Sequence, residues 1–189
     1  AQASLNRALE LKLDGPAAEE AQARLTLLQI DPAQPASETL SQLESSLAKL
    51  PDDPVVLVRL ASLHEQAGRV DDAIAENEQA QKASPQNIRP LLNLARLHHA
   101  KGNKERALEY GRQARKLNSD SPEVATTLGR IAFASGDHGW AASLLQEAAR
   151  RSTNDPELQL DLAEASFAVG RLDAAQEATD RALTAPVFA

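Results

Sequence analysis

The stretch PEVATTLGRIAFASGDHGWAASLLQEAARRSTND, residues 122–155, is followed at once by PELQLDLAEASFAVGRLDAAQEATDRALTAPVFA, residues 156–189. Aligned with each other, the two segments of 34 residues share a leucine, a small residue after it, a glycine and two alanines. In the first segment these are Leu128, Gly129, Gly136, Ala141 and Ala148. A fixed spacing of this length is typical of a chain built from structural repeats.

Two earlier segments, residues 54–87 and 88–121, carry the same pattern. The glycines recur every 34 residues, at Gly68, Gly102, Gly136 and Gly170. The leucine and the small residue recur as Leu60-Ala61, Leu94-Ala95, Leu128-Gly129 and Leu162-Ala163. The two alanines recur as Ala73 and Ala80, Ala107 and Ala114, Ala141 and Ala148, and Ala175 and Ala182. We therefore predict four repeats, 54–87, 88–121, 122–155 and 156–189.

Each repeat has the signals of two antiparallel helices. A glycine is the residue that most readily adopts the left-handed conformation at a helix end. The small residue after each leucine allows the two helices of a repeat to pack closely. The first helices also begin with capping residues, Asp53-Pro54, Asn87-Ile88, Ser121-Pro122 and Asp155-Pro156. Alanine and leucine dominate the composition while aromatic residues make up only 3 %, so the predicted fold class is all-α.

This pattern resembles the tetratricopeptide repeat family, whose unit is a pair of antiparallel helices joined at a glycine. The resemblance covers residues 54 to about 186 and implies a right-handed α-solenoid. The family's large aromatic residues are mostly absent from the first helices. Their place is taken by His64, His98, Ala132 and Ser166, and phenylalanines follow one residue later at Phe133 and Phe167.

The N-terminal third fits the same architecture less well. Residues 16–53 are predicted to form a degenerate repeat, four residues over the period, with helices over 16–30 and 37–50. Residues 1–15 are predicted to form a half repeat that consists of a second helix only. The prediction is thus one repeat array over 1–189. We expect it to be part of a longer protein, because the array starts in mid-repeat and lacks methionine.

Composition and motifs exclude several classes of function. The net charge of −7 argues against a general affinity for nucleic acid, and no apolar run is long enough to insert into a membrane. The chain has no cysteine, and its four histidines do not form a ligand set. We find no catalytic motif and expect a non-enzymatic protein with no cofactor and no metal. A cytoplasmic and a bacterial periplasmic or envelope location both fit.

The resemblance also implies where a partner would bind, because the first helices of this family line a concave groove. The positions that would face this groove include Arg59, Arg89, Asn93, Arg96 and Arg130. The last repeat contributes Glu157, Asp161 and Glu164 instead. Since arginine suits two-pronged recognition of carboxylates, we predict a protein or peptide ligand of acidic character. The alternative is that the arginines only form a solvated helix face.

Some members of the family clamp the carboxylates at the C-termini of chaperones. Of the five positions that such a clamp needs, this chain has Val58, Ser62, Asn93, Glu123 and Thr127. Only Asn93 matches, so a chaperone cofactor is disfavoured. Trp140 is expected to pack at the start of a second helix rather than to anchor a partner.

Two functions therefore remain open. The first is a non-enzymatic scaffold for protein–protein interaction that binds its ligand in the groove. The second is a structural or assembly segment of a larger bacterial envelope or polysaccharide-export protein of this family. In that function the open ends of the array stack on further repeats or on another copy, which would give self-association.

Overall fold

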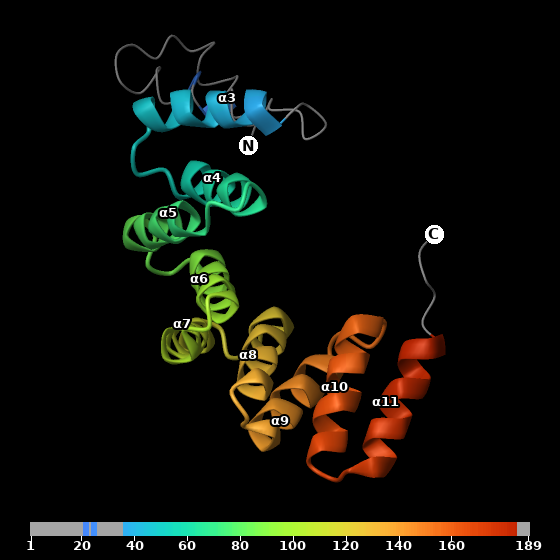
Figure 1. Cartoon of the computed structure of the whole chain (residues 1–189). Coiled ribbons are helices and arrows are strands. Elements are labelled where there is room, and N and C mark those ends of the chain that lie inside the picture. The colour runs from blue at the N-terminus through green and yellow to red at the C-terminus, as the bar shows by residue number, and fades with distance from the viewer. Residues whose placement is uncertain (1–20, 23, 26–35, 185–189) are drawn as a thin grey trace. The chain divides into compact units, whose positions relative to one another are not determined.

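The computed structural model describes residues 21, 22, 24, 25 and 36–184 of the chain. In this described part every regular element is a helix (Figure 1), which confirms the predicted all-α class. The half repeat predicted for 1–15, most of the helix predicted for 16–30 and the tail after residue 184 lie outside the described residues. The chain divides into two compact units, Ala1–Pro90 and Leu91–Ala189.

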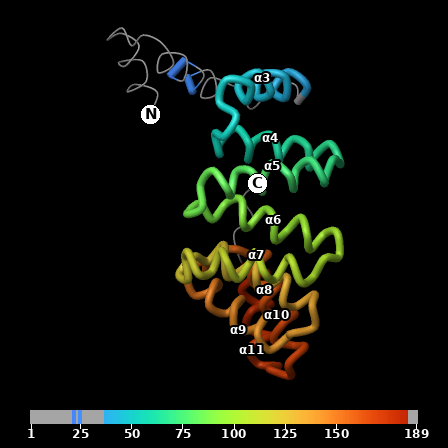
Figure 2. The backbone as a smooth tube through the Cα atoms, turned by 90° about the vertical axis from the view of Figure 1, so that its left-hand side faces the viewer, coloured from blue at the N-terminus to red at the C-terminus, as the bar shows by residue number. Residues whose placement is uncertain are grey.

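Three described helices belong to the first unit. They are α3 (Ala36–Lys49), α4 (Pro54–Gln66) and α5 (Val70–Ala83). Helix α4 packs against both α3 and α5, and α4 and α5 lie side by side in Figures 1 and 2. Leu43 of α3 packs on Val56 and Leu60 of α4 in a small apolar cluster.

Helix α6 (Ile88–Ala100) begins just before the second unit. It is followed by α7 (Lys104–Leu117), α8 (Pro122–Ala134), α9 (His138–Ala149), α10 (Pro156–Ala168) and α11 (Leu172–Thr184). The pairs α8–α9 and α10–α11 are each joined through a glycine turn, and α10 packs against α9 as well as α11. The largest core cluster runs through these four helices and consists mainly of alanine and leucine.

The predicted caps begin all four of the first helices, and at α6 the Asn87 side chain accepts from the backbone N–H of Arg89. The Asp53 carboxylate accepts from the backbone N–H groups of Val55 and Val56. Ser121 accepts from Val124 in the same way, and Asp155 accepts from Leu158. Each cap satisfies backbone donors that the first turn of a helix leaves without a partner.

Glycine is required at the turns because of the backbone conformation there. Gly68, Gly102, Gly136 and Gly170 all have positive φ, between 75° and 91°. An L-residue is disfavoured in this region. Gly129 is required for another reason, since a Cβ at that position would lie 2.8 Å from the Leu145 Cγ of α9. Close contact between the helices of a repeat thus explains the small residue after the leucine.

The histidines at the family's aromatic positions are packing residues. His64 is 8 % exposed, and its Nδ1 lies 2.8 Å from Glu76 Oε1 of α5. Burial raises the pKa of the Glu76 carboxyl above its ordinary value of 4.5, although the neighbouring His64 opposes the shift. His98 is 3 % exposed and stacks on Tyr110 of α7, with ring centroids 5.5 Å apart.

Candidate peptide-binding site

The predicted groove residues are found in both units. Arg59 on α4 and Arg89 in the first turn of α6 belong to Ala1–Pro90. Asn93 and Arg96 on α6 and Arg130 on α8 belong to Leu91–Ala189. The four arginines are exposed and Asn93 is half-buried. All five residues therefore lie on first helices, with side chains at least partly accessible.

Helix α6 places three of these residues on one face. Arg89, Asn93 and Arg96 are spaced by four and three residues, so their side chains follow one another along the helix. Each of them also interacts with other residues of the chain. This spacing is suited to an extended ligand that runs along the helix and meets one side chain per turn.

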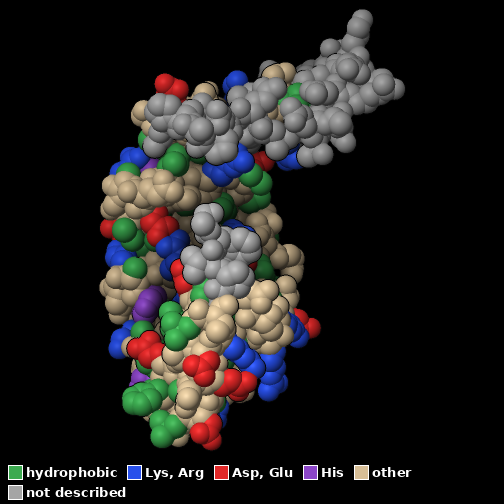
Figure 3. All heavy atoms as spheres, turned by 90° about the vertical axis from the view of Figure 1, so that its right-hand side faces the viewer, with side chains coloured by type: hydrophobic (Ala, Val, Ile, Leu, Met, Phe, Trp, Pro, Cys, Tyr) green, Lys and Arg blue, Asp and Glu red, His purple; other side chains and the backbone are tan. Residues whose placement is uncertain are grey.

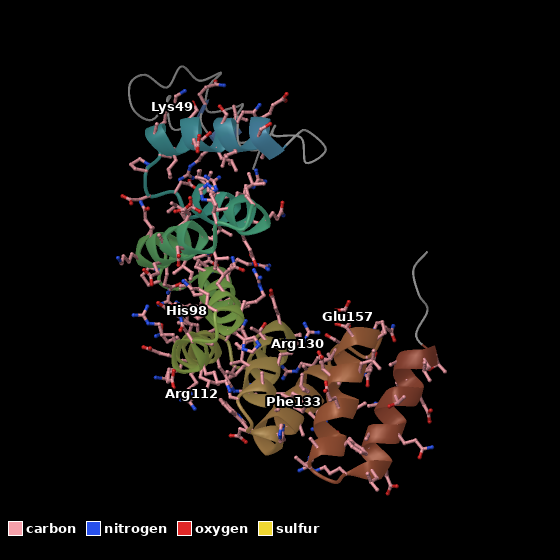
Figure 4. The ribbon with its side chains drawn as sticks, viewed as in Figure 1. Lys49, His98, Arg112, Arg130, Phe133 and Glu157 are labelled. Carbon is pink, nitrogen blue, oxygen red and sulfur yellow. The ribbon has the colours of Figure 1, made fainter. Side chains whose placement is uncertain are left out.

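Arg130 has acidic partners from the next repeat. Its Nε lies 2.5 Å from Asp161 Oδ2, and its Nη2 lies 3.8 Å from Glu157 Oε2. Figure 4 shows Arg130 on α8 and Glu157 at the start of α10. The Arg130 side chain is 46 % exposed, that of Asp161 is 27 % exposed and that of Glu157 is 83 % exposed. Asp161 is thus the close partner and Glu157 the loose one.

A pocket of about 310 Å³ opens beside Arg130, between α8 and the start of α10. On the α8 side it is lined by Glu123, Thr126, Thr127 and Arg130, and the other side by Ser152, Asp155 and Leu158. The Asp155 carboxylate is already engaged in capping α10. The pocket therefore offers a guanidinium, an exposed carboxylate and three hydroxyl groups, which can bind a peptide through hydrogen bonds.

The sequence identified part of this pocket. The sequence predicts Arg130 for the groove but identifies Glu123 and Thr127 only as mismatches to the chaperone clamp. Ser152 and Asp155 were not assigned to the groove, because they lie in the connection between α9 and α10. The available signal for a place in the pocket is that both residues lie within four positions of the predicted start of a first helix at Pro156.

Trp140 packs as expected. It is half-buried against the core cluster of α8–α11. The guanidinium carbon of Arg112 on α7 lies 5.3 Å from the centre of its ring, a distance that suits a cation–π interaction. Among the described residues, no group of three His, Cys, Asp or Glu side chains could hold a metal ion. The same part of the chain contains no helix with the length and apolar character to span a membrane.

Family models for the tetratricopeptide repeat match residues 18–88, 88–121 and 132–185. The chain is a member of the tetratricopeptide repeat family. This family consists generally of non-catalytic repeat scaffolds that bind protein partners. Among curated protein sequences, none matches this chain.

Solved structures of bacterial proteins have the same fold. The repeat protein TTC0263 of Thermus thermophilus is 23 % identical over 88 % of this chain and 91 % of its own, with a TM-score of 0.68. A tetratricopeptide repeat protein of Parabacteroides merdae is 17 % identical over 100 % of this chain and 73 % of its own, with a TM-score of 0.73. PilF of Pseudomonas aeruginosa is 18 % identical over 92 % of this chain and 78 % of its own, with a TM-score of 0.69.

Proposed function

We propose that this chain is a non-enzymatic scaffold that binds an extended acidic peptide of a partner protein along its first helices. The observation that carries the proposal is the pocket beside Arg130, a residue of the helix face that the family resemblance implies for ligand binding. Arg96 on α6, which belongs to the same unit as Arg130, is exposed and would extend this recognition to a second first helix. A rigid repeat scaffold keeps the ordering cost of binding low.

The geometry of Arg130 is compatible with an acidic ligand. Asp161 holds the guanidinium through Nε at 2.5 Å, which fixes its orientation. Among the described residues, the Nη2 atom contacts only Glu157, at 3.8 Å. A ligand carboxylate can therefore replace Glu157 at Nη2 without displacing Asp161. Such exposed contacts are worth about 0.2–1 kcal/mol each, so affinity must come from several of them.

The test is an array of peptides in which glutamates are spaced along an otherwise neutral sequence, with lysine-substituted copies beside them. The charge-reversed double variant Arg96→Glu/Arg130→Glu should bind the acidic peptides at least ~10-fold more weakly than the wild type. Binding by the wild type should fall as salt rises, because the arginines are solvent-facing.

The matched control is Lys116→Glu/Arg106→Glu, which makes the same change in net charge on exposed residues of the second helix α7. This control should retain most of the affinity. If both double variants lose affinity equally, the effect is one of net charge, and the proposed groove is wrong. Selection of the lysine peptides by the wild type would also contradict the proposal.

A second candidate function, assembly through the end of the array, is favoured by a specific observation. Phe167 is 68 % exposed, whereas its equivalent Phe133 packs partly buried against the core of α8–α11. Leu183 of α11 is 78 % exposed, whereas its equivalent Ala149 of α9 is 3 % exposed. Each of these exposed apolar side chains offers a contact to a further repeat or a second copy, as in a larger bacterial envelope protein of this family.

Sedimentation velocity over a range of protein concentrations tests this second function. Self-association through this end predicts a concentration-dependent species that is lost in the variant Phe167→Asp/Leu183→Asp. A single species at all concentrations would show that these surfaces do not join two copies of the chain. The far-ultraviolet spectrum of the variant serves as its folding control.

A further inference from the structure

A second pocket lies between the last three helices and shares no residue with the pocket beside Arg130. It has a volume of about 260 Å³. Its walls come from α9 and α11, and Leu162 and Ser166 of α10 form its floor. Three arginines line it, namely Arg150, Arg171 and Arg181.

The charge in this pocket is opposite to that of the chain. Arg181 is paired with Glu177, another lining residue, at 2.5 Å. Within the described part of the chain, the side chains of Arg150 and Arg171 have no carboxylate partner. Three arginines against one glutamate leave two positive charges in a chain whose net charge is −7. In Figure 3, where the right-hand side of Figure 1 faces the viewer, basic side chains gather on the lower right of the molecule.

Ser166 contributes a hydroxyl group to the floor of the pocket. It is only 2 % exposed and lines the pocket. A hydroxyl can donate to an oxygen atom of a ligand, and the planar guanidinium groups suit the oxygens of a carboxylate or phosphate.

The preceding repeat shows that this pocket is a local feature and not a consequence of the fold. Residues 34 positions earlier are Asp137, Trp140 and Glu147, in place of Arg171, Ala174 and Arg181. There the indole of Trp140 packs against the core, and Glu147 is paired with Arg115 at 2.7 Å. In the last repeat, Ala174 stands where the preceding repeat has the Trp140 indole, which leaves space for the pocket. Arg171 and Arg181 stand where that repeat has two carboxylates, which makes the pocket basic.

We propose that this pocket binds a small multivalent oxyanion, either a phosphate group or a dicarboxylate. Arg150 and Arg171 hold the anion from α9 and from the turn before α11, and the Ser166 hydroxyl donates to it from the floor. Arg181, already neutralised by Glu177, closes the side of the pocket. The proposal does not depend on peptide binding beside Arg130, since the two pockets use different residues.

The experiment is a calorimetric titration of the full chain with inorganic phosphate at low ionic strength, and a parallel titration with succinate. We expect saturable binding of at least one of the two anions, and the tighter one identifies the ligand chemistry. Arg150→Gln/Arg171→Gln should weaken this binding at least ~10-fold. Ala174→Trp, which copies the residue of the preceding repeat, should abolish binding without changing the charge.

The control variant is Arg151→Gln. Arg151 is the neighbour of Arg150 but pairs with Asp120 and does not line the pocket, so its loss should leave the affinity unchanged. The proposal is overturned if neither anion shows saturable binding, or if Arg151→Gln weakens binding as much as the double variant. Full affinity in a folded Ala174→Trp protein would also overturn it. The arginine variants decide the matter alone if Ala174→Trp does not fold.

Discussion

The Nε of Arg130 lies 2.5 Å from Oδ2 of Asp161, which stands 31 residues later on the next first helix. This ion pair joins Arg130, one of the predicted groove residues, to the acidic residues of the last repeat. Arg130, Asp161 and Glu157 are therefore neighbours in the structure, and their charges partly neutralise each other. Recognition of a ligand at this point must work with a guanidinium that already has one carboxylate partner.

The first prediction concerns the strength of this ion pair. Both side chains are partly exposed, so a double-mutant cycle with Arg130→Gln and Asp161→Asn should give a coupling energy of about 0.2–1 kcal/mol. The measurement is urea unfolding of the four proteins at low and at high salt. The coupling should shrink at high salt. A coupling energy of zero at low salt would contradict the contact.

The second prediction compares two glycines of one turn region. Gly136 has φ +91°, and a Cβ there would meet no atom within 4 Å. Gly136→Ala should therefore destabilise the protein by about 1–2 kcal/mol through the backbone alone. Gly139 lies in the first turn of α9, where a Cβ meets Asp137 Oδ1 only at 4.0 Å. Gly139→Ala should be neutral or stabilising by up to about 1 kcal/mol. Equal effects in thermal unfolding would contradict this account.

The third prediction concerns a buried amide. Gln159 is fully buried, and neither polar atom of its side chain has a hydrogen-bond partner among the described residues. The equivalent positions are Leu57, Leu91 and Ala125. Gln159→Leu should raise the free energy of unfolding by about 1–3 kcal/mol, because it removes two unsatisfied groups.

The reverse substitution, Ala125→Gln, is the matched control for Gln159. Ala125 is 0 % exposed in the core of α8–α11, so a glutamine there should destabilise through overpacking and an unsatisfied amide. Both variants are measured by chemical denaturation. Destabilisation by Gln159→Leu would show that the amide has a partner that stabilises the fold.

The fourth prediction is a pH dependence that arises from Glu76. Burial raises the pKa of this carboxyl above 4.5, so the native state binds its proton more tightly than the unfolded chain does. Its contribution to stability is therefore present below pH 4.5 and is lost as the pH rises toward the raised pKa. Relative to Glu76→Gln, the wild type should become less stable over this interval. The measured quantity is the unfolding free energy of the wild type minus that of Glu76→Gln. If this difference stays constant or rises with pH, the raised pKa of Glu76 is contradicted.

The helices could be predicted from the sequence because their signals are local and repeated. The backbone at Gly68 requires a residue that tolerates positive φ, and the first turn of α10 requires a side chain such as Asp155 to cap it. The period then gives the pairing of helices, since each repeat can bury its apolar face only against its neighbours. The small residue at Gly129 follows from the close approach of Leu145.

The candidate sites were only partly predictable, because they depend on contacts between repeats. The period places Arg130 and Asp161 on equivalent helices but does not give the distance between their side chains. The basic pocket depends on an alanine, Ala174, at the position where the preceding repeat has Trp140. The smaller side chain creates space only when α9, α10 and α11 pack together. That exchange is visible in the aligned repeats, yet its consequence requires the tertiary structure.

The most direct test of peptide binding on the first helices is to map the bound peptide by amide chemical shifts. The ligand is the tightest acidic peptide from the array, titrated into isotope-labelled protein. The account predicts that the largest shifts fall on residues 122–130 of α8 and 152–161 around the start of α10, and that Arg130→Glu removes them. Shifts confined to α9 and α11, with residues 122–130 unchanged, would contradict it.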